Sequence, residues 1–485
     1  MITNKNHIQL GLKAGLEIHQ QLNSSSKLFC RCPSFLRSDQ PNVLIKRKLH
    51  KVAGEMGEID QAVAHEASLD KEFIYQGYND TTCLLEYDEC PPYDINKDAL
   101  EEALKIALLL NCEIYPVTQI MRKTVIDGSN TGGFQRTVLL GHSGFIECSF
   151  GKVGIETLVL EEDAARIVNR GEKEVVFRLD RLGIPLIEIA TAPVLDTGEK
   201  IKECALKIGE ILRACKVKRG IGTIRQDVNI SIKGHDRVEI KGFQDPSMMI
   251  KTIDLEILRQ EEELKKVRKS GEVRNAKEDG STEFLRPMPG KARMYPETDL
   301  PLLKIGRDFI NGIKKKLPKL KHEIRDELKK KGLSDELINL VLDGNLDEFE
   351  VLMRVYDKDA NLIAKMVCLW RQELASKHGK KIDDVRKVLT ERILEDILEA
   401  LNDGEIGEGD VKIVMGKIMN GIELKEALKI ERLDDNKLEE EIVKIVKEKP
   451  GLREGAYMGL IIGKLGKDVD KRKAMEILKR IVNIK

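Results

Sequence analysis

Two residues near the start of the chain could act together on a metal ion or a nucleotide. Apolar and polar side chains alternate over residues 12–19, which predicts a strand with Glu17 and His19 on one face. Their Cα atoms would lie roughly 7 Å apart by strand rise. A carboxylate beside an imidazole suits a hard divalent ion. The alternative is the solvated face of an edge strand, and spacing alone favours that alternative.

Two further carboxylates occupy positions where a charge is costly. Glu161 ends the apolar run 157–160, and Glu188 interrupts the run 183–190, which otherwise resembles a buried strand. A carboxylate in such a run destabilises the fold unless it meets a cation. We therefore expect a metal ion, an arginine or a lysine beside Glu188, and we favour a functional role for it.

A polar face is also predicted for the hairpin 227–241. Asp227, Asn229 and Ser231 alternate with apolar residues before the turn 233–236, and Arg237, Glu239 and Lys241 do so after it. Paired strands would bring these groups together on one face. Many half-buried antiparallel sheets have this pattern, so a binding face and an ordinary solvated face are about equally favoured.

The segment 127–136 is rich in glycine and in hydroxyl and amide donors, among them Ser129, Thr131 and Gly132. Exposed backbone N–H groups in such a loop can bind phosphate, although a plain hairpin turn would have the same composition. The sequence contains no G-x-x-x-x-G-K-[ST], G-x-G-x-x-G, H-E-x-x-H or G-x-S-x-G pattern. A nucleotide would have to bind in another way.

The nine cysteines are scattered and odd in number, which favours free thiols in a reducing compartment. Cys30 and Cys32 would form half of a zinc site if a second pair followed at short spacing, but the next cysteines are Cys83 and Cys90. A four-thiolate site is the less favoured reading, and we expect no zinc.

The composition is that of a folded protein of several domains. The 485 residues suggest about three domains. Lys+Arg and Asp+Glu number 82 each, and 41% of the residues are apolar, which excludes a disordered chain. No apolar run approaches the length of a membrane span, and residues 1–9 have no secretory pattern, so we expect a cytoplasmic protein without membrane contact.

Two patterns of secondary structure divide the chain. Up to about residue 300, strands are expected at 11–19, 156–162, 184–190, 227–232 and 237–241. A helix is expected from the N-cap Thr197, and another over 248–269. Four prolines exclude regular structure from 286–301. The remainder is helical in pattern. We expect domains 1–302, 303–382 and 383–485.

Several ordered strings resemble one family. They are GLEIHQQL (15–22), LEEDAA (160–165), GIPLIEI (183–189), RQDVNIS (225–231) and EIKG (239–242). Together they resemble the B/E subunit family of tRNA-dependent amidotransferases. Residues 286–301 (RPMPGKARMYPETDLP) are similar to the archaeal E subunits that act on glutamyl-tRNA(Gln). Residues 451–467 are similar to the tRNA-binding tail of the family, and the resemblance covers nearly the whole chain.

The resemblance implies an α+β protein: an N-terminal cradle domain with a mixed or antiparallel sheet, then all-helical middle and tail domains. It implies a two-step reaction in which ATP phosphorylates the glutamate γ-carboxylate on misacylated tRNA(Gln) and ammonia displaces the phosphate. The ammonia would come from an asparaginase-like partner, the D subunit, in a heterodimer or a dimer of heterodimers.

The resemblance also assigns residues. Catalytic roles fall on His19, Glu161 and Glu188, and these three with Glu17 would bind Mg²⁺ or Mn²⁺. The nucleotide and substrate pocket would include Ser129, Thr131, Gly132, Arg225, Asp227, Asn229, Glu239 and Lys241. The tail would contact tRNA through Arg453, Lys464 and Lys467. Residues 441–485 contain twelve Lys and Arg against six Asp and Glu. This local excess of positive charge agrees with phosphate contacts.

Two departures from the family pattern stand out. Archaeal E subunits carry a domain, similar to one in bacterial aspartyl-tRNA synthetases, ahead of the RPMPG segment, and this chain has only residues 271–285 there. The second cysteine pair of the bacterial B subunit's zinc site is also missing. Two alternatives stay open: a B-type subunit paired with an amidase-signature glutaminase, and a tRNA-binding scaffold whose catalytic centre has decayed.

Overall fold

The computed structural model describes residues 4–50, 57, 59, 61–243, 246–266, 271–288, 294–430, 435–465 and 471–482. The chain forms two compact units, Met1–Leu320 and Lys321–Lys485. Within the described ranges, no helix has both the length and the apolar character that crossing a bilayer requires.

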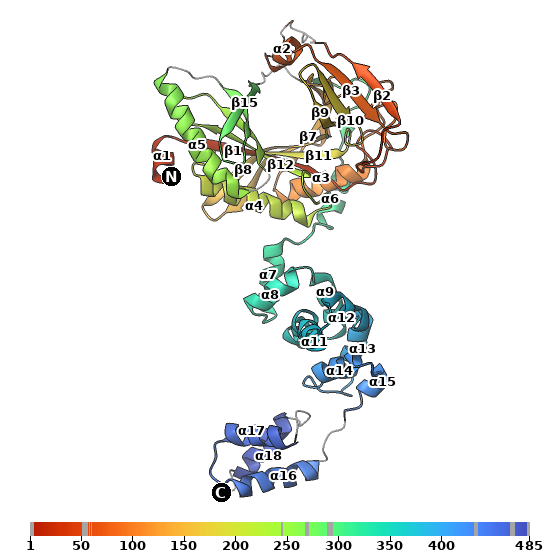
Figure 1. Cartoon of the computed structure of the whole chain (residues 1–485), viewed down its shortest axis with the longest axis vertical. Helices are drawn as coiled ribbons and strands as arrows, with labels where there is room; N and C mark the ends of the chain where they lie inside the picture. Colours follow the sequence, from red (N-terminus) through yellow and green to blue (C-terminus); the bar gives the residue numbers. More distant parts are fainter. Residues whose placement is uncertain are drawn as a thin grey trace. The chain divides into compact units, whose positions relative to one another are not determined.

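The first unit is built on an 11-stranded sheet (Figure 1). Its neighbouring strands are antiparallel, except that β13 and β14 are parallel. In spatial order the strands are β15 (Thr282–Pro287), β14 (Glu272–Ala276), β13 (Val238–Phe243), β12 (Ile224–Ser231), β1 (Lys13–Gln21), β11 (Pro185–Thr191), β8 (Gly151–Glu162), β7 (Phe134–Cys148), β6 (Ile120–Thr124) and β16 (Met294–Pro296), with β4 (Glu113–Ile114) also paired to β7.

Helices cover one face of this sheet, namely α3 (Lys97–Leu109), α4 (Gly198–Ala214) and α5 (Pro246–Lys265), with the short α1 (Asn4–Gln9) and α6 (Arg307–Lys314) at its borders. Alternation along β1 decides which side chains face the helices. Leu16 and Ile18 belong to the core shared with α4, so Glu17 and His19 project from the other face. Thr197 caps α4, because its hydroxyl accepts a hydrogen bond from the Lys200 N–H.

A smaller sheet lies on the side of the main sheet opposite α3 and α4 (Figure 1). Its order is β2 (Val43–Arg47), β3 (Glu72–Gly77), β10 (Glu174–Arg178) and β9 (Arg166–Arg170), and α2 (Gln61–Ser68) precedes β3. A separate aromatic core that includes Phe73, Tyr75 and Phe177 stabilises it. The strands β5 (Val117–Thr118) and β17 (Leu303–Lys304) form a two-stranded ribbon.

Ion pairs fasten the end of α5 to β14. The Arg259 guanidinium lies 3.2 Å from a Glu272 oxygen, and Arg274 of β14 lies 3.9 Å from a Glu256 oxygen of α5. These ion pairs hold α5 beside β14, the next element in the sequence.

The second unit is helical and contains two separate cores. One spans α7 to α15, and the other lies among α16, α17 and α18. The helices are α7 (Lys321–Lys330), α8 (Asp335–Leu342), α9 (Leu346–Val355), α10 (Ala360–Ala364), a π-helical turn at Lys365–Trp370, α11 (Arg371–His378), α12 (Ile382–Val388), α13 (Glu391–Asn402), α14 (Val411–Met419), α15 (Leu424–Ala427), α16 (Asp435–Glu448), α17 (Glu454–Leu465) and α18 (Lys471–Val482).

The α+β class is confirmed, and each expected strand and helix overlaps an observed one. The expectation for residues 286–301 is wrong in part, because β15 ends at Pro287 and β16 at Pro296. Both strands lie at the edges of the sheet. Proline has no N–H, but on an edge strand this group can face solvent, so no hydrogen bond between strands is lost.

The observed divisions differ from the expected boundaries at 302 and 383. Residues 303–320 belong to the first unit, because Ile305 and Ile313 are buried in its core. Residue 383 falls inside the larger helical core, since Val385 and Leu389 pack in the same cluster as Leu352. The separate core at the C-terminal end begins only at Leu438.

Candidate active site

The polar faces of the central strands line a pocket of about 620 Å³. β1 is the middle strand of the site, and His19 lies opposite Glu188 on one neighbour and opposite Arg225 on the other. Glu161 enters from β8, the strand beyond β11. Residues far apart in the sequence are thus brought together by strand register.

The three predicted catalytic residues form one donor group. The His19 Nε2 atom is 3.4 Å from an oxygen of Glu188 and 3.9 Å from an oxygen of Glu161. One ligand atom from each residue lies within 4.8 Å of the other two, which is close enough to surround a single ion.

A second donor group shares His19 with the first. It consists of Glu17, His19 and Asp227, again with their ligand atoms within 4.8 Å of one another. His19 Nε2 lies 3.5 Å from a Glu17 oxygen. Carboxylates with one imidazole are the donors that Mg²⁺ and Mn²⁺ accept, so both groups fit the expected metal by their chemistry.

The acidic surroundings set the charge of His19. Burial alone would lower the pKa of His19, but the hydrogen bond to Glu188 and the charges of Glu188, Glu17 and Glu161 outweigh it and raise that pKa to about 8. Burial and the charge of Glu188 raise the pKa of Glu17 to about 7. The pKa of Glu188 is lowered despite burial, because Lys123 and His19 stabilise its anion.

The cation expected beside Glu188 is Lys123, a residue that the sequence did not single out. Its Nζ atom lies 2.6 Å from Glu161 and 3.2 Å from Glu188. The Thr137 hydroxyl donates a hydrogen bond to the same Glu161 oxygen at 3.2 Å. Lys123 belongs to β6, three strands away from Glu188, so no local pattern joins the two.

The hairpin β12–β13 also lines the pocket. Lys241 Nζ lies 2.8 Å from Asp227 and 2.5 Å from Glu239, and Asn229 pairs in register with Glu239. Arg225 also lines the pocket. All five predicted residues of the hairpin therefore face the site.

Arg225 is positioned by an acid that sequence reasoning missed. Its guanidinium lies 2.9 Å from an oxygen of Asp163. Asp163 is fully buried and also accepts a hydrogen bond from the Gln21 amide at 2.5 Å. Burial opposes its charge, but Arg225 and Arg181 lower the pKa of Asp163. Its position two residues after Glu161 was the one available signal.

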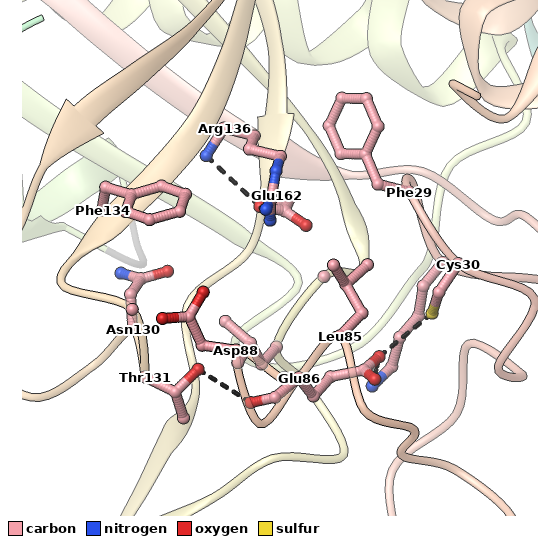
Figure 2. Close-up of a pocket in the computed structure, with 14 residues that line it drawn as sticks. Phe29, Cys30, Leu85, Glu86, Asp88, Asn130, Thr131, Phe134, Arg136 and Glu162 are labelled. Carbon is pink, nitrogen blue, oxygen red and sulfur yellow. Dashed lines mark hydrogen bonds and ion pairs between the residues drawn. The ribbon is translucent and has the colours of Figure 1, made fainter. Parts of the chain in front are cut away.

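The glycine-rich loop divides between two cavities. Ser129 lines the large pocket, whereas Thr131 and Gly132 line a small cavity of about 20 Å³ beside it. Figure 2 shows the Thr131 hydroxyl donating a hydrogen bond to the Glu86 carbonyl, at 2.7 Å. The loop therefore brings only Ser129 of the three predicted residues to the site.

Glu162 faces this small cavity, on the other side of the sheet from Glu161. It forms an ion pair with Arg136 at 3.4 Å (Figure 2). Burial raises the pKa of Glu162, although Arg136 opposes the shift. Arg136 also binds Glu297, whose side chain is fully buried.

A thiol cluster lies at the far end of the same cavity. Ligand atoms of Cys30, Cys32, Cys83 and Glu86 lie within 4.8 Å of one another. Glu86 also accepts a hydrogen bond from Lys27 Nζ at 2.8 Å. The sequence shows no second cysteine pair at short spacing that could complete a metal site with Cys30 and Cys32. The fold nevertheless places Cys83 and Glu86 beside them, so four donor side chains are brought together. The donors suit a soft divalent ion.

The predicted tail residues are only partly described. Arg453 is exposed and immediately precedes α17. Lys464 is 46% exposed and lies 3.5 Å from Glu448 and 3.9 Å from Glu441, which would compete with a phosphate for it. Lys467 lies outside the described residues.

Comparison with known proteins shows the family to which the chain belongs. The model of the GatB/GatE catalytic domain matches residues 12–311. The E subunit of glutamyl-tRNA(Gln) amidotransferase from Methanocaldococcus jannaschii is 36% identical over 98% of this chain and 99% of its own length. The proteins of the same name from Methanococcus maripaludis and Methanothermobacter thermautotrophicus are each 34% identical, over 89% and 84% of this chain and 90% and 86% of their own lengths.

The chain belongs to the GatB/GatE family of amidotransferase subunits. Within the class, the three relatives above place it beside the E subunits of methanogenic archaea. The first alignment extends over 626 positions, which exceeds the 485 residues of this chain by 141. That difference agrees with the expected lack of an inserted domain.

Proposed function

We propose that this chain is the activating and amidating subunit of a glutamyl-tRNA(Gln) amidotransferase. It transfers the γ-phosphoryl group of ATP to the γ-carboxylate of glutamate on tRNA(Gln), and ammonia then converts the acyl phosphate to the amide. The observation that carries this proposal is the pair of overlapping donor groups that share His19 in a pocket flanked by Lys123, Arg225 and Lys241.

The chemistry explains why such a pocket is needed. The substrate carboxylate and the ATP phosphates are both anionic and repel each other, so the reaction needs fixed positive charge. A Mg²⁺ or Mn²⁺ ion held by His19, Glu161 and Glu188, with Glu17 beside them, would neutralise phosphate charge when bound. Lys241 and Arg225 line the same pocket and would orient the anions.

The two steps balance without a further reagent. A carboxylate oxygen forms a bond to the γ-phosphorus as the bond to ADP breaks. The ammonia nitrogen then bonds to the acyl carbon, phosphate leaves with the electron pair of the C–O bond, and the nitrogen loses a proton. An acyl phosphate hydrolyses in open water, so ammonia must reach a site that excludes bulk solvent.

The supply of ammonia requires a partner. Membership of the family implies a multi-subunit amidotransferase. We propose that an asparaginase-like D subunit releases ammonia, in a heterodimer or a dimer of heterodimers, and that α16–α18 contact the tRNA through Arg453, Lys464 and Lys467. Such contacts would be electrostatic and would follow RNA shape.

One experiment tests the proposed reaction without the partner. The purified chain is mixed with ATP, Mg²⁺, ammonium chloride and glutamyl-tRNA(Gln), the ester is hydrolysed, and glutamine is measured. We expect glutamine from the wild-type chain, none from His19→Ala, and a normal yield from the control His142→Ala, a histidine outside the pocket. ADP formed only with charged tRNA, but without glutamine, would show that activation occurs and that amidation needs the partner.

Two other functions are less well supported. A B-type subunit with an amidase-signature glutaminase is disfavoured, because the three relatives described above are E subunits. A decayed tRNA-binding scaffold is hard to reconcile with the close approach of His19, Glu161 and Glu188. Absence of both ADP and glutamine in the assay would favour the scaffold.

A further inference from the structure

The ammonium group of Lys123 lies between two carboxylates of the proposed metal site. Its Nζ atom contacts Glu161 at 2.6 Å and Glu188 at 3.2 Å. The Glu188 oxygen concerned, Oε2, is the same atom that lies 3.4 Å from His19 Nε2. The three side chains are largely shielded from solvent, with 13%, 2% and 18% of the Lys123, Glu161 and Glu188 side chains exposed.

This arrangement has a simple electrostatic cause. Two carboxylates brought together at low exposure repel each other and lose hydration, so they stay close only if a cation lies beside them. Lys123 supplies that cation from within the chain. A divalent ion bound to Glu161, Glu188 and His19 would compete for the Glu188 oxygen that Lys123 and His19 both approach, and it would repel the ammonium group at such short range.

We infer that Lys123 is a tethered counter-ion of the metal site: its ammonium group holds Glu161 and Glu188 together, and a divalent ion displaces it into the pocket. This inference rests on the proposed metal at His19, Glu161 and Glu188. It assigns to Lys123 a role in tuning metal affinity.

The fold leaves room for this exchange without a change of backbone. β6 is fixed on both sides, because Lys123 pairs in register with Gln135 of β7 and with Met294 of β16. The lysine side chain itself lines the 620 Å³ pocket. Rotation about its side-chain bonds is therefore sufficient, and the released charge would point toward the space where anionic substrate groups must bind.

Mn²⁺ binding tests the inference without measuring activity. Free Mn²⁺ is followed by electron paramagnetic resonance as the full-length chain is added, for the wild type and for Lys123→Met, Lys123→Arg and His19→Ala. In the wild type, Mn²⁺ must compete with the Lys123 ammonium group for the carboxylates. Coupling between two sites typically changes an affinity by about fivefold or more, so we expect Lys123→Met to bind Mn²⁺ at least about fivefold more tightly than the wild type. Lys123→Arg keeps the charge and should not bind more tightly than the wild type.

The control is Lys152→Met, which removes one exposed charge from the start of the same strand that carries Glu161. It should bind Mn²⁺ like the wild type. Equal or weaker binding by folded Lys123→Met would overturn the inference and leave the proposed function intact. Failure of every variant, wild type included, to bind Mn²⁺ at this site would overturn both.

A second measurement uses only the wild-type chain, in case Lys123→Met does not fold. Reductive methylation of lysines with formaldehyde and cyanoborohydride is followed by mass spectrometry, with and without Mg²⁺. Methylation of Lys123 should accelerate when Mg²⁺ is added. Lys27, which is buried and paired with Glu86, should stay protected in both conditions. An unchanged rate at Lys123, under conditions where Mg²⁺ binds, contradicts displacement.

Discussion

His19 and Glu188 lie directly opposite each other on the antiparallel strands β1 and β11, and their side chains meet at 3.4 Å. A cross-strand pair of this kind is fixed by the backbone ladder and does not depend on a loop. The proposed catalytic centre is thus held by paired central strands of the sheet, with Glu161 added from β8 in the same ladder.

Removal of Glu188 should separate activation from tRNA binding. Loss of one electrostatic group in a catalytic site typically lowers the rate by about 10²–10³, and we expect Glu188→Ala to lose ATP-dependent glutamine formation by at least about 100-fold. Its affinity for tRNA should be nearly unchanged in a filter-binding assay. Glu174→Ala, at the exposed first residue of β10, is the control. Weaker tRNA binding with normal phosphorylation would contradict the assignment of Glu188.

Metal affinity should depend on pH in a direction set by His19. The pKa of His19 is raised to about 8, so below pH 8 the imidazole carries a proton that a metal ligand must lose. The apparent Mn²⁺ affinity should therefore fall by about tenfold per pH unit below pH 8, and more steeply below pH 7, where Glu17 also takes up a proton. Calorimetric titration between pH 6.5 and 9, values chosen to bracket that pKa, would measure it. An affinity that stays constant across this range would exclude His19 as a ligand.

Glu297 should be critical for the stability of the first unit. Its buried carboxylate accepts hydrogen bonds from Arg122 at 2.6 Å and from Arg136 at 2.8 Å. Breaking a buried ion pair by removing one partner costs about 3–5 kcal/mol, so Glu297→Gln should lower the midpoint of sheet unfolding, followed by the amide infrared band. The exposed pair of Glu283 with Lys277 gives the control Glu283→Gln.

The same experiment contains an internal reference. Trp370 is the chain's single tryptophan and lies in the second unit. Its fluorescence transition should stay unchanged in Glu297→Gln if the lost stability is confined to the first unit. A shift of the Trp370 transition equal to that of the sheet would show that the two units unfold together.

Removal of the last three helices should weaken tRNA binding and leave activation intact. The larger helical core extends across residue 383, so a cut there would expose apolar residues, whereas a chain ending at residue 430 keeps that core whole. Each lost phosphate contact should reduce the slope of log K against log salt by about 0.9. A truncated chain with an unchanged salt slope would remove α16–α18 from tRNA recognition.

Local alternation is enough to predict part of the site. From the two-residue period of a strand alone, the sequence predicts that Glu17 and His19 share a face and that the Glu188 carboxylate lies beside a cation. The identity of that cation, Lys123, depends on how four strands are ordered in the sheet. No sequence pattern within β6 carries that information.

The same limit explains two other differences. Thr131 is close to Ser129 in the sequence, and we therefore predicted it in the site. The Thr131 hydroxyl instead donates a hydrogen bond to the Glu86 carbonyl. A separation of 51 residues argues against pairing Cys83 with Cys32, yet the fold brings the two thiols together. In each case a long-range contact decides the outcome, and sequence separation is a poor measure of distance.

The ion pairs between α5 and β14 have an evolutionary consequence. Arg259 with Glu272, and Arg274 with Glu256, hold the end of the helix beside the start of the strand. A junction whose two ends are already fixed next to each other tolerates the gain or loss of a whole domain, because neither event alters the path of the sheet. Lineages that shed such a domain at this junction would keep the strand order around His19 unchanged.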